Sequence, residues 1–251
     1  MQQISLLNQV SQWNLDGVAD LLGANPLTNV SSVPFITGLF GRQCASLTGS
    51  LINEFTAADS ASLEISGAAA TWAIWFKPTN LSNTVMGLML KGANTGTLTA
   101  AQHEYGCNFS TANSLLTFRA SNGTTTTTVS TANAISYTAW NLGLFWMDSS
   151  NKLNIQLNGG TAAINSTALS GGIWNGGSNG WPLYLGYSSV TGVARYYTGL
   201  MGPISFWKRV LTAAERALLW NGGAGLAFPF GYDQPPAMGG GMNDLVGGIA
   251  A

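Results

Sequence analysis

The chain has 251 residues, of which 46% are hydrophobic and 8% charged, so it has globular apolar content and about a third of the usual charge. Its formal net charge of −1, with 9 Lys+Arg, supplies no clustered basic footprint, which argues against a nucleic-acid partner. Glycines interrupt the charge-free stretch 153–194, so membrane insertion is not expected either. A surface of hydroxyls and amides cannot rely on charge repulsion, and we expect a module that is built into an assembly or displayed at a surface.

Alternation of apolar and other residues with a period of two dominates the chain and predicts β-strands. In chain order the predicted strands are 72–77, 85–91, 115–120, an exposed Thr-rich strand at 124–128, 142–147, 153–157, 183–187 and 204–207. Residues 142–147 are apolar on both faces, which indicates a central strand between two layers. Asn158-Gly159 predicts a hairpin turn, because both residues tolerate positive φ. Strands of this length and spacing are typical of a sandwich or jelly roll.

One short helix is predicted near the end of the regular structure. Thr212 and Glu215 have the spacing of a capping box, in which each side chain bonds the backbone amide of the other. Asn221-Gly222 supplies a left-handed stop.

The two ends of the chain differ in composition from the middle. We expect three parts: an N-terminal arm at 1–9, one domain at 10–230, and a flexible Pro/Gly-rich tail at 231–251. The tail has an apolar tip formed by Leu245, Val246 and Ile249. Two interpretations stay open for it: a disordered terminus, or a docking arm that pairs with a neighbouring subunit.

Few residues are suited to catalysis or metal binding. Cys44 and Cys107 are too few for a disulfide framework and are expected to be small buried residues, although a single bond between them stays open. His103 is the only histidine, which rules out a multi-histidine zinc site, and we expect it at the surface or a strand edge. A retaining glycoside hydrolase needs two carboxyl groups about 5 Å apart. No two acids fall within four residues along a predicted strand, so hydrolysis would need acids from distant segments.

Two tryptophans flank a polar loop and form the candidate ligand site. Trp174 and Trp181 enclose a Gly/Asn/Ser segment that contains Asn175 and Asn179. Aromatic faces beside amide groups suit glycans, because sugar C–H faces pack on rings and hydroxyls need donors and acceptors. The alternative is that both rings cap the end of the sandwich or lie in a subunit interface.

Four segments, in order, resemble a laminin-G-like domain of the concanavalin A-like lectin/glucanase superfamily. They are Trp13-Asn14-Leu15-Asp16, then 45–49 with 59–63, then Ala73-Ile74-Trp75-Phe76-Lys77-Pro78, and finally 206–216 with Asn221-Gly222-Gly223. This resemblance implies a jelly-roll sandwich of two antiparallel sheets over nearly the whole globular part. It implies much less about function, since this fold serves lectins, hydrolases, adhesive modules and virion proteins.

Two departures from the family pattern bear on calcium. The family resemblance implies acids that help to hold a structural calcium ion, but Gly202 and Pro203 stand at two such positions and Gly17 at another. Because calcium takes carboxylates among its six to eight oxygen ligands, we expect no cofactor, although a structural calcium ion held by carbonyl oxygens stays open.

The leading hypothesis is a non-enzymatic phage virion protein, a capsid decoration or fibre-type component. The closing signature resembles versions found in bacteriophage and environmental bacterial proteins. Its expected partners are other virion subunits or copies of itself, together with surface glycans, and it would be made in the host cytoplasm and carried on the virion. The alternative is a carbohydrate-binding or adhesion module, secreted or on a bacterial surface. A glycoside hydrolase is the third hypothesis.

Overall fold

The computed structural model describes residues 4–49, 53–65, 69–79, 85–93, 99–137, 139–177, 179–190 and 193–230. The predicted docking residues Leu245, Val246 and Ile249 lie outside this part. Among the described residues, no helix has the length and apolar character needed to cross a membrane.

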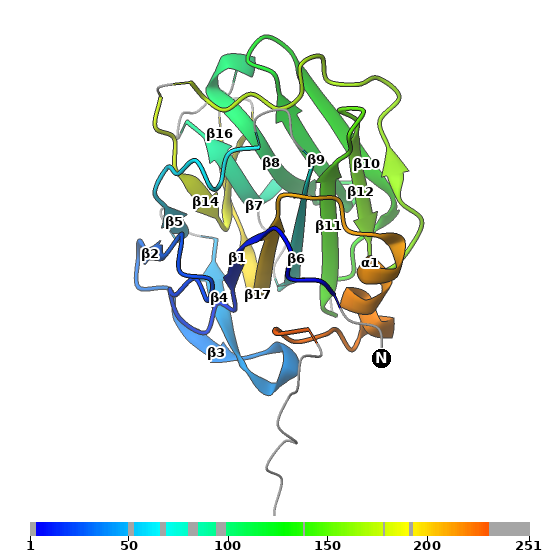
Figure 1. Cartoon of the computed structure of the whole chain (residues 1–251). Coiled ribbons are helices and arrows are strands. Elements are labelled where there is room, and N and C mark those ends of the chain that lie inside the picture. Colours follow the sequence, from blue (N-terminus) through cyan, green and yellow to red (C-terminus); the bar gives the residue numbers. More distant parts are fainter. Residues whose placement is uncertain are drawn as a thin grey trace, which may run out of the picture.

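Two antiparallel sheets form a sandwich (Figure 1). The eight-stranded sheet has the order β13 (Ala163–Ile164), β12 (Leu153–Leu157), β11 (Asn141–Met147), β6 (Ala70–Pro78), β17 (Thr198–Trp207), β4 (Gln43–Thr48) and β3 (Phe35–Thr37), and β1 (Gln9–Trp13) also pairs with β17. The seven-stranded sheet has the order β10 (Thr126–Ala134), β9 (Leu115–Ser121), β8 (His103–Ser110), β7 (Val85–Gly92), β14 (Leu183–Leu185), β5 (Phe55–Ala57) and β2 (Leu27–Asn29). This architecture confirms the predicted concanavalin A-like jelly roll.

Smaller elements complete the fold. β15 (Tyr187–Val190) and β16 (Val193–Tyr196) form a separate hairpin, and α1 (Ala213–Trp220) is the α-helix of the described part. Three 3₁₀ turns are at Leu39–Gly41, Ala100–Gln102 and Asn221–Gly223. The predicted turn at Asn158-Gly159 has positive φ at both residues, 51° and 69°.

The main core fills the space between the two sheets. Trp72 of β6 stacks on Phe206 of β17, with ring centroids 4.0 Å apart, and on Trp13 of β1 at 6.2 Å. All three side chains are buried. Burying large rings contributes much of the stabilisation, since each aromatic side chain removes roughly 150–250 Å² from water.

A second apolar layer covers the outer face of the eight-stranded sheet. Leu142 and Leu144 of β11 pack there with Leu219 of α1, while Phe145 of the same strand points into the main core. This arrangement confirms the prediction that 142–147 is apolar on both faces because it lies between two layers.

The residues expected to form an N-terminal arm lie against the domain from residue 4 onward. Ile4 is buried in the same outer layer as α1, and Leu6 packs against that layer. Figure 1 shows the start of the described chain, in dark blue, beside α1.

The cysteines and the histidine are all buried. Cys44 in β4 and Cys107 in β8 are free thiols that belong to different sheets, so the open disulfide alternative does not form. His103 begins β8, as expected for a strand edge along the chain, but it is 1% exposed. The expectation of a surface histidine was therefore wrong, because the 3₁₀ turn before β8 packs over it and Thr99 O lies 2.9 Å from its Nδ1.

Candidate functional site

The two loop tryptophans meet at one end of the seven-stranded sheet. Their ring centroids are 5.5 Å apart and their planes are nearly perpendicular, at 86°. The backbone N–H of Trp174 donates to Ser121 O at 2.9 Å, which anchors the loop at the end of β9. Both indoles are half-buried. Trp181 also packs against the tyrosine-rich cluster beside β7 and β14, so its ring acts partly as a cap.

A shallow depression of about 280 Å³ lies beside Trp174. Its lining residues come from two loops: Asn122, Ser170, Gly171, Gly172, Ile173, Trp174 and Asn175. Asn122 is occupied in holding these loops together, because its Oδ1 accepts from the amide of Thr125 at 2.7 Å and its Nδ2 donates to Ser170 O at 3.0 Å. The exposed Asn175 accepts from Gly177 N–H at 3.2 Å through Oδ1, which leaves its amide donors directed to solvent.

The four predicted site residues therefore divide into two pairs. Trp174 and Asn175 line the depression, whereas Asn179 and Trp181 do not. Asn179 donates through Nδ2 to Gly176 O and stabilises the turn between the tryptophans. A role of these four residues in ligand binding stays a prediction.

Beneath this loop lies a buried charge cluster. Lys91, at the end of β7, places Nζ 2.5 Å from Asp59 Oδ1, 3.1 Å from Glu104 Oε1 and 2.8 Å from the carbonyl oxygen of Trp181. The side chains of Lys91 and Glu104 are 0% and 1% exposed, while that of Asp59 is 29% exposed. The cluster thus ties the tryptophan loop to the sheet.

Burial dominates the chemistry of this cluster. It raises the pKa of Glu104 to about 8, against the lowering effect of the Lys91 charge and hydrogen bond. A Cβ at Gly176 would lie 2.7 Å from Glu104 Oε1, so the loop backbone packs directly on the carboxyl group. Sequence patterns missed the cluster because Asp59, Lys91 and Glu104 come from three distant segments. The sequence contained one indication of the cluster: Lys91 lies near the end of an apolar strand, and Glu104 lies near the start of the next one.

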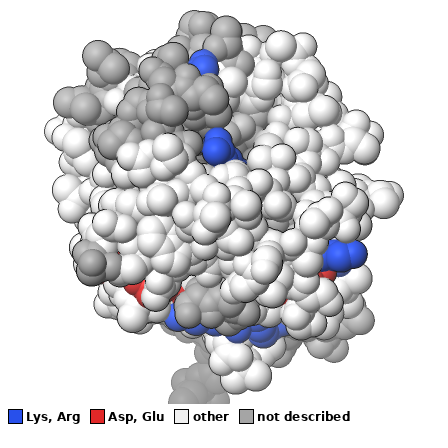
Figure 2. All heavy atoms as spheres, turned by 90° about the horizontal axis from the view of Figure 1, so that it is seen from above, with Lys and Arg blue, Asp and Glu red and all other residues white. Residues whose placement is uncertain are grey.

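Few charges reach the surface. In the view from above, most atoms belong to uncharged residues, and cationic atoms occur at isolated places, one of them at a hollow (Figure 2). The described part of this face therefore offers mainly uncharged groups.

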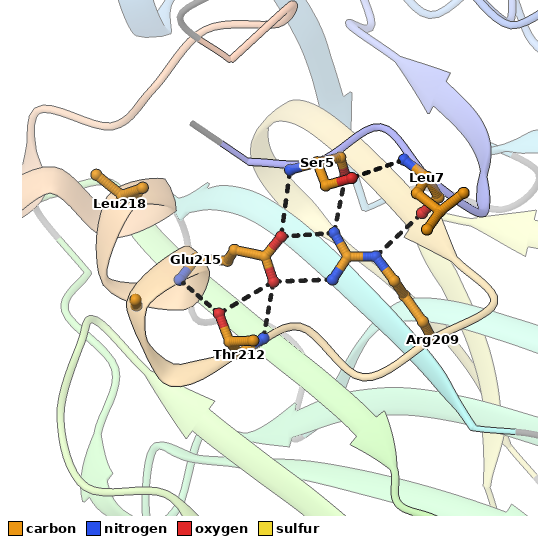
Figure 3. A pocket seen from close by; sticks show the side chains of 7 residues that line it. Ser5, Leu7, Arg209, Thr212, Glu215 and Leu218 are labelled. Carbon is orange, nitrogen blue, oxygen red and sulfur yellow. Dashed lines mark hydrogen bonds and ion pairs between the residues drawn. The ribbon is translucent and has the colours of Figure 1, made fainter. Parts of the chain in front are cut away.

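A second depression, of about 400 Å³, lies between the N-terminal segment and α1 (Figure 3). Arg209 donates to both carboxylate oxygens of Glu215, at 2.8 and 2.6 Å, and also to the carbonyl oxygens of Ser5 and Leu7. Glu215 also accepts from the backbone N–H of Thr212 at 2.9 Å. Burial acts to raise the pKa of Glu215, but the bonds from Arg209 and the backbone outweigh it and lower the pKa to about 2. These groups satisfy one another, so this network holds the N-terminal segment in place.

Position 202 has no room for a calcium-binding carboxylate, whereas the space beside Gly17 is open. A Cβ at Gly202 would lie 3.1 Å from the Trp140 ring and 3.3 Å from Trp75 Cβ, so indole packing occupies the space that a carboxylate would need. The described residues contain no group of three or more His, Cys, Asp or Glu side chains that could hold a metal ion.

Solved structures with a similar fold include domains described as binding domains. The binding domain of Paraclostridial Mosquitocidal Protein 1 matches with a TM-score of 0.64 and 14% identity over 85% of this chain and 52% of that one. The binding domain of botulinum neurotoxin DC in complex with SialylT gives a TM-score of 0.61 and 9% identity over 85% and 51%. This chain therefore spans about half the length of these toxin domains.

One similar structure has nearly the size of this chain. Domain 4 of AbnA, a GH43 extracellular arabinanase from Geobacillus stearothermophilus, in complex with arabinotriose, has a TM-score of 0.59 and 14% identity. The match covers 85% of this chain and 97% of that domain. At such identities the likeness shows the fold alone.

Sequence comparison decides the family. A search of curated proteins gives no match to this chain. The family model Laminin_G_3, described as the concanavalin A-like lectin/glucanases superfamily, matches residues 53–215, which is more than half of the sequence. The chain belongs to the concanavalin A-like lectin/glucanases superfamily.

Proposed function

We propose that the chain is a non-catalytic carbohydrate-binding module whose ligand site is the depression beside Trp174. The observation that carries this proposal is the pairing of a half-buried indole with the exposed amide of Asn175 on one shallow surface. Sugar rings offer apolar C–H faces to aromatic side chains, and their hydroxyls accept from amide donors. The proposal is further supported by the fold, which is shared with a domain described in complex with arabinotriose.

The arrangement of the acids supports a binding role over hydrolysis. Asp59 and Glu104 both contact Lys91 Nζ, so their carboxyl groups come close enough to resemble the pair of a retaining hydrolase. The lysine neutralises one charge, however, and Glu104 is buried beneath the tryptophan loop. A substrate cannot reach Glu104 unless this loop opens. We expect no sugar release by the purified chain, and hydrolysis that Glu104→Gln abolishes would overturn this part of the proposal.

The binding proposal is tested with a glycan array followed by calorimetry on the strongest ligand. Trp174→Ala should weaken binding at least ten-fold, because stacking on an aromatic ring is lost, and Asn175→Ala should weaken it by a smaller factor. Ile164→Ala is the control, since Ile164 is 53% exposed on the edge strand β13, away from the tryptophan loop. Equal affinity of Trp174→Ala and the unaltered chain would refute the site.

A separate proposal concerns where the module is carried. It rests on the sequence, because the fold does not indicate a location. We infer that the module is carried on a phage virion as a capsid decoration or fibre-type component, with a bacterial surface or secreted adhesion module as the alternative. Its support is the resemblance of the closing signature and the surface with few charges. Mass spectrometry of purified particles tests it: absence of the chain from any particle counts against the virion.

A further inference from the structure

Arg119 lies on the outer face of the seven-stranded sheet. Its neighbours in β9, Phe118 and Ala120, point into the main core, so the arginine side chain points away from it. In the register of the sheet, Arg119 lies between Gly106 of β8 and Thr128 of β10. Neither neighbour supplies a charge.

This arginine has no anionic partner in the described part of the chain. It is half-buried, and its Nε is shielded from solvent without a hydrogen-bond acceptor. By contrast, Arg209 pairs with Glu215, and Arg216 donates to Gln156 Oε1 at 2.9 Å. Burial lowers the pKa of the Arg119 guanidinium, as expected for a cation that has lost solvation and gained no counter-charge. An anionic ligand would offset that cost.

His103, whose pKa is affected by the Arg119 charge, does not supply the missing counter-charge. Burial first, and the Arg119 charge second, lower the pKa of His103 to about 4. Its imidazole is therefore neutral at pH 7 and neither pairs with the guanidinium nor adds to its charge.

Two aromatic residues help to locate Arg119: Tyr184, three strands away across the sheet, and Trp174, whose loop is anchored along β9. Across Gly106, the same row continues with Leu90 of β7 and Tyr184 of β14, which belong to a buried apolar cluster. Along β9, Ser121 is two residues from Arg119, about 7 Å at the usual strand rise, and its carbonyl oxygen accepts from Trp174 N–H. A saccharide that stacks on Trp174 would have to pass the 3₁₀ turn at Ala100–Gln102 to contact the guanidinium, because Ser121 is buried and its hydroxyl donates to Ala100 O.

We propose that Arg119 forms a subsite for an anionic group of a saccharide, a carboxylate or a sulfate, so that the module prefers acidic to neutral glycans. This inference rests on the proposed carbohydrate-binding function and adds the ligand class. The planar guanidinium donates two parallel hydrogen bonds to such an oxyanion, which gives direction as well as charge.

The test is a glycan array that carries uronic-acid, sialylated and sulfated oligosaccharides, each together with its neutral counterpart. The affinities for the most strongly bound acidic glycan and for its neutral counterpart are then measured by titration. We expect the unaltered chain to bind the acidic member at least ten-fold more tightly and to lose part of that preference between 50 and 200 mM salt. Arg119→Gln should remove the preference while leaving affinity for the neutral member unchanged, and Arg119→Lys should keep part of it. Comparison of the carboxylated and sulfated arms identifies the anion.

Arg42→Gln is the matched control, because Arg42 is exposed beside β4 in the other sheet and its replacement changes the net charge equally. Retention of the acidic preference in Arg119→Gln, or its loss in Arg42→Gln, overturns the subsite. Equal binding of acidic and neutral glycans by the unaltered chain also overturns it, yet leaves the carbohydrate-binding proposal standing. Binding to no glycan overturns both. Thermal unfolding of each variant distinguishes loss of binding from loss of fold. If Arg119→Gln does not fold, Arg119→Lys tests the subsite in its place.

Discussion

At the scale of single residues, burial rather than sequence neighbourhood decides the chemistry of the polar groups. Glu104 and Glu54 are both buried carboxyl groups, and burial raises their pKa values to about 8 and about 7. Lys91 lies 3.1 Å from Glu104 but does not restore a normal pKa, because the desolvation cost of the carboxylate is larger than the gain from the pair.

These raised pKa values predict that stability falls as pH rises. Between the unfolded value of 4.5 and the folded values near 7 and 8, the folded chain holds protons that the unfolded chain has released. The free energy of unfolding should therefore decrease from pH 5 to pH 8. The decrease should be less steep below pH 6.5, because the lowered pKa of His103, about 4, acts in the opposite direction there. Urea titrations across this range measure the slope, and Glu104→Gln should flatten it.

Glu54→Gln serves as the comparison for that experiment. Glu54 precedes β5 and is not part of the Lys91 ion pairs, so this variant should remove only the portion of the slope below about pH 7. A stability that rises with pH in the unaltered chain would contradict both assignments.

At the scale of elements, local sequence sets the start and end of α1, and long-range contacts place it. Thr212 Oγ1 accepts from Glu215 N–H at 3.2 Å, and Asn221 adopts the left-handed conformation with φ 45°, both as the pattern predicted. The carboxylate of Glu215 then bonds Arg209 and Ser5, which connects the cap to the N-terminal segment.

This connection predicts that the cap matters to the whole domain. Thr212→Ala removes an N-cap acceptor and should lower the free energy of unfolding by about 1 kcal/mol. Chemical denaturation measures the change. Thr161→Ala, at an exposed loop threonine between β12 and β13, should alter stability by less than about 0.5 kcal/mol. Equal effects of the two substitutions would show that the cap contributes nothing specific.

At the scale of the whole molecule, the low charge and the polar surface suit contact with other molecules. Residues 4–9 are held on the domain through Ile4 and the Arg209 network, although Leu7 is exposed. The tail at 231–251 is then the segment to test for attachment.

Deletion of residues 231–251 should weaken incorporation into particles or association between copies, since it removes the apolar tip of Leu245, Val246 and Ile249. Sedimentation and particle composition measure the effect. The melting temperature of the same variant, measured alongside, separates loss of attachment from loss of fold. Unchanged incorporation would refute the docking-arm interpretation.

The sequence by itself determined the fold class, several of the longer strands, the capped helix and the two-faced strand at 142–147. Each of these follows from a local period, a short motif or the family resemblance, because such patterns report which faces of an element are buried. Sequence also drew attention to Trp174 and Asn175, because an aromatic beside a Gly/Asn loop is a local signal.

Tertiary structure alone decided which distant residues share a site. Asp59, Lys91 and Glu104 meet only because strand pairing brings the ends of three segments together, and His103 is buried only because a turn covers it. The same holds for Arg119. Its Nε lacks a hydrogen-bond partner because strand pairing places the uncharged Gly106 beside it. The physical cause is that pairing register and desolvation depend on contacts far apart along the chain, which no local pattern records.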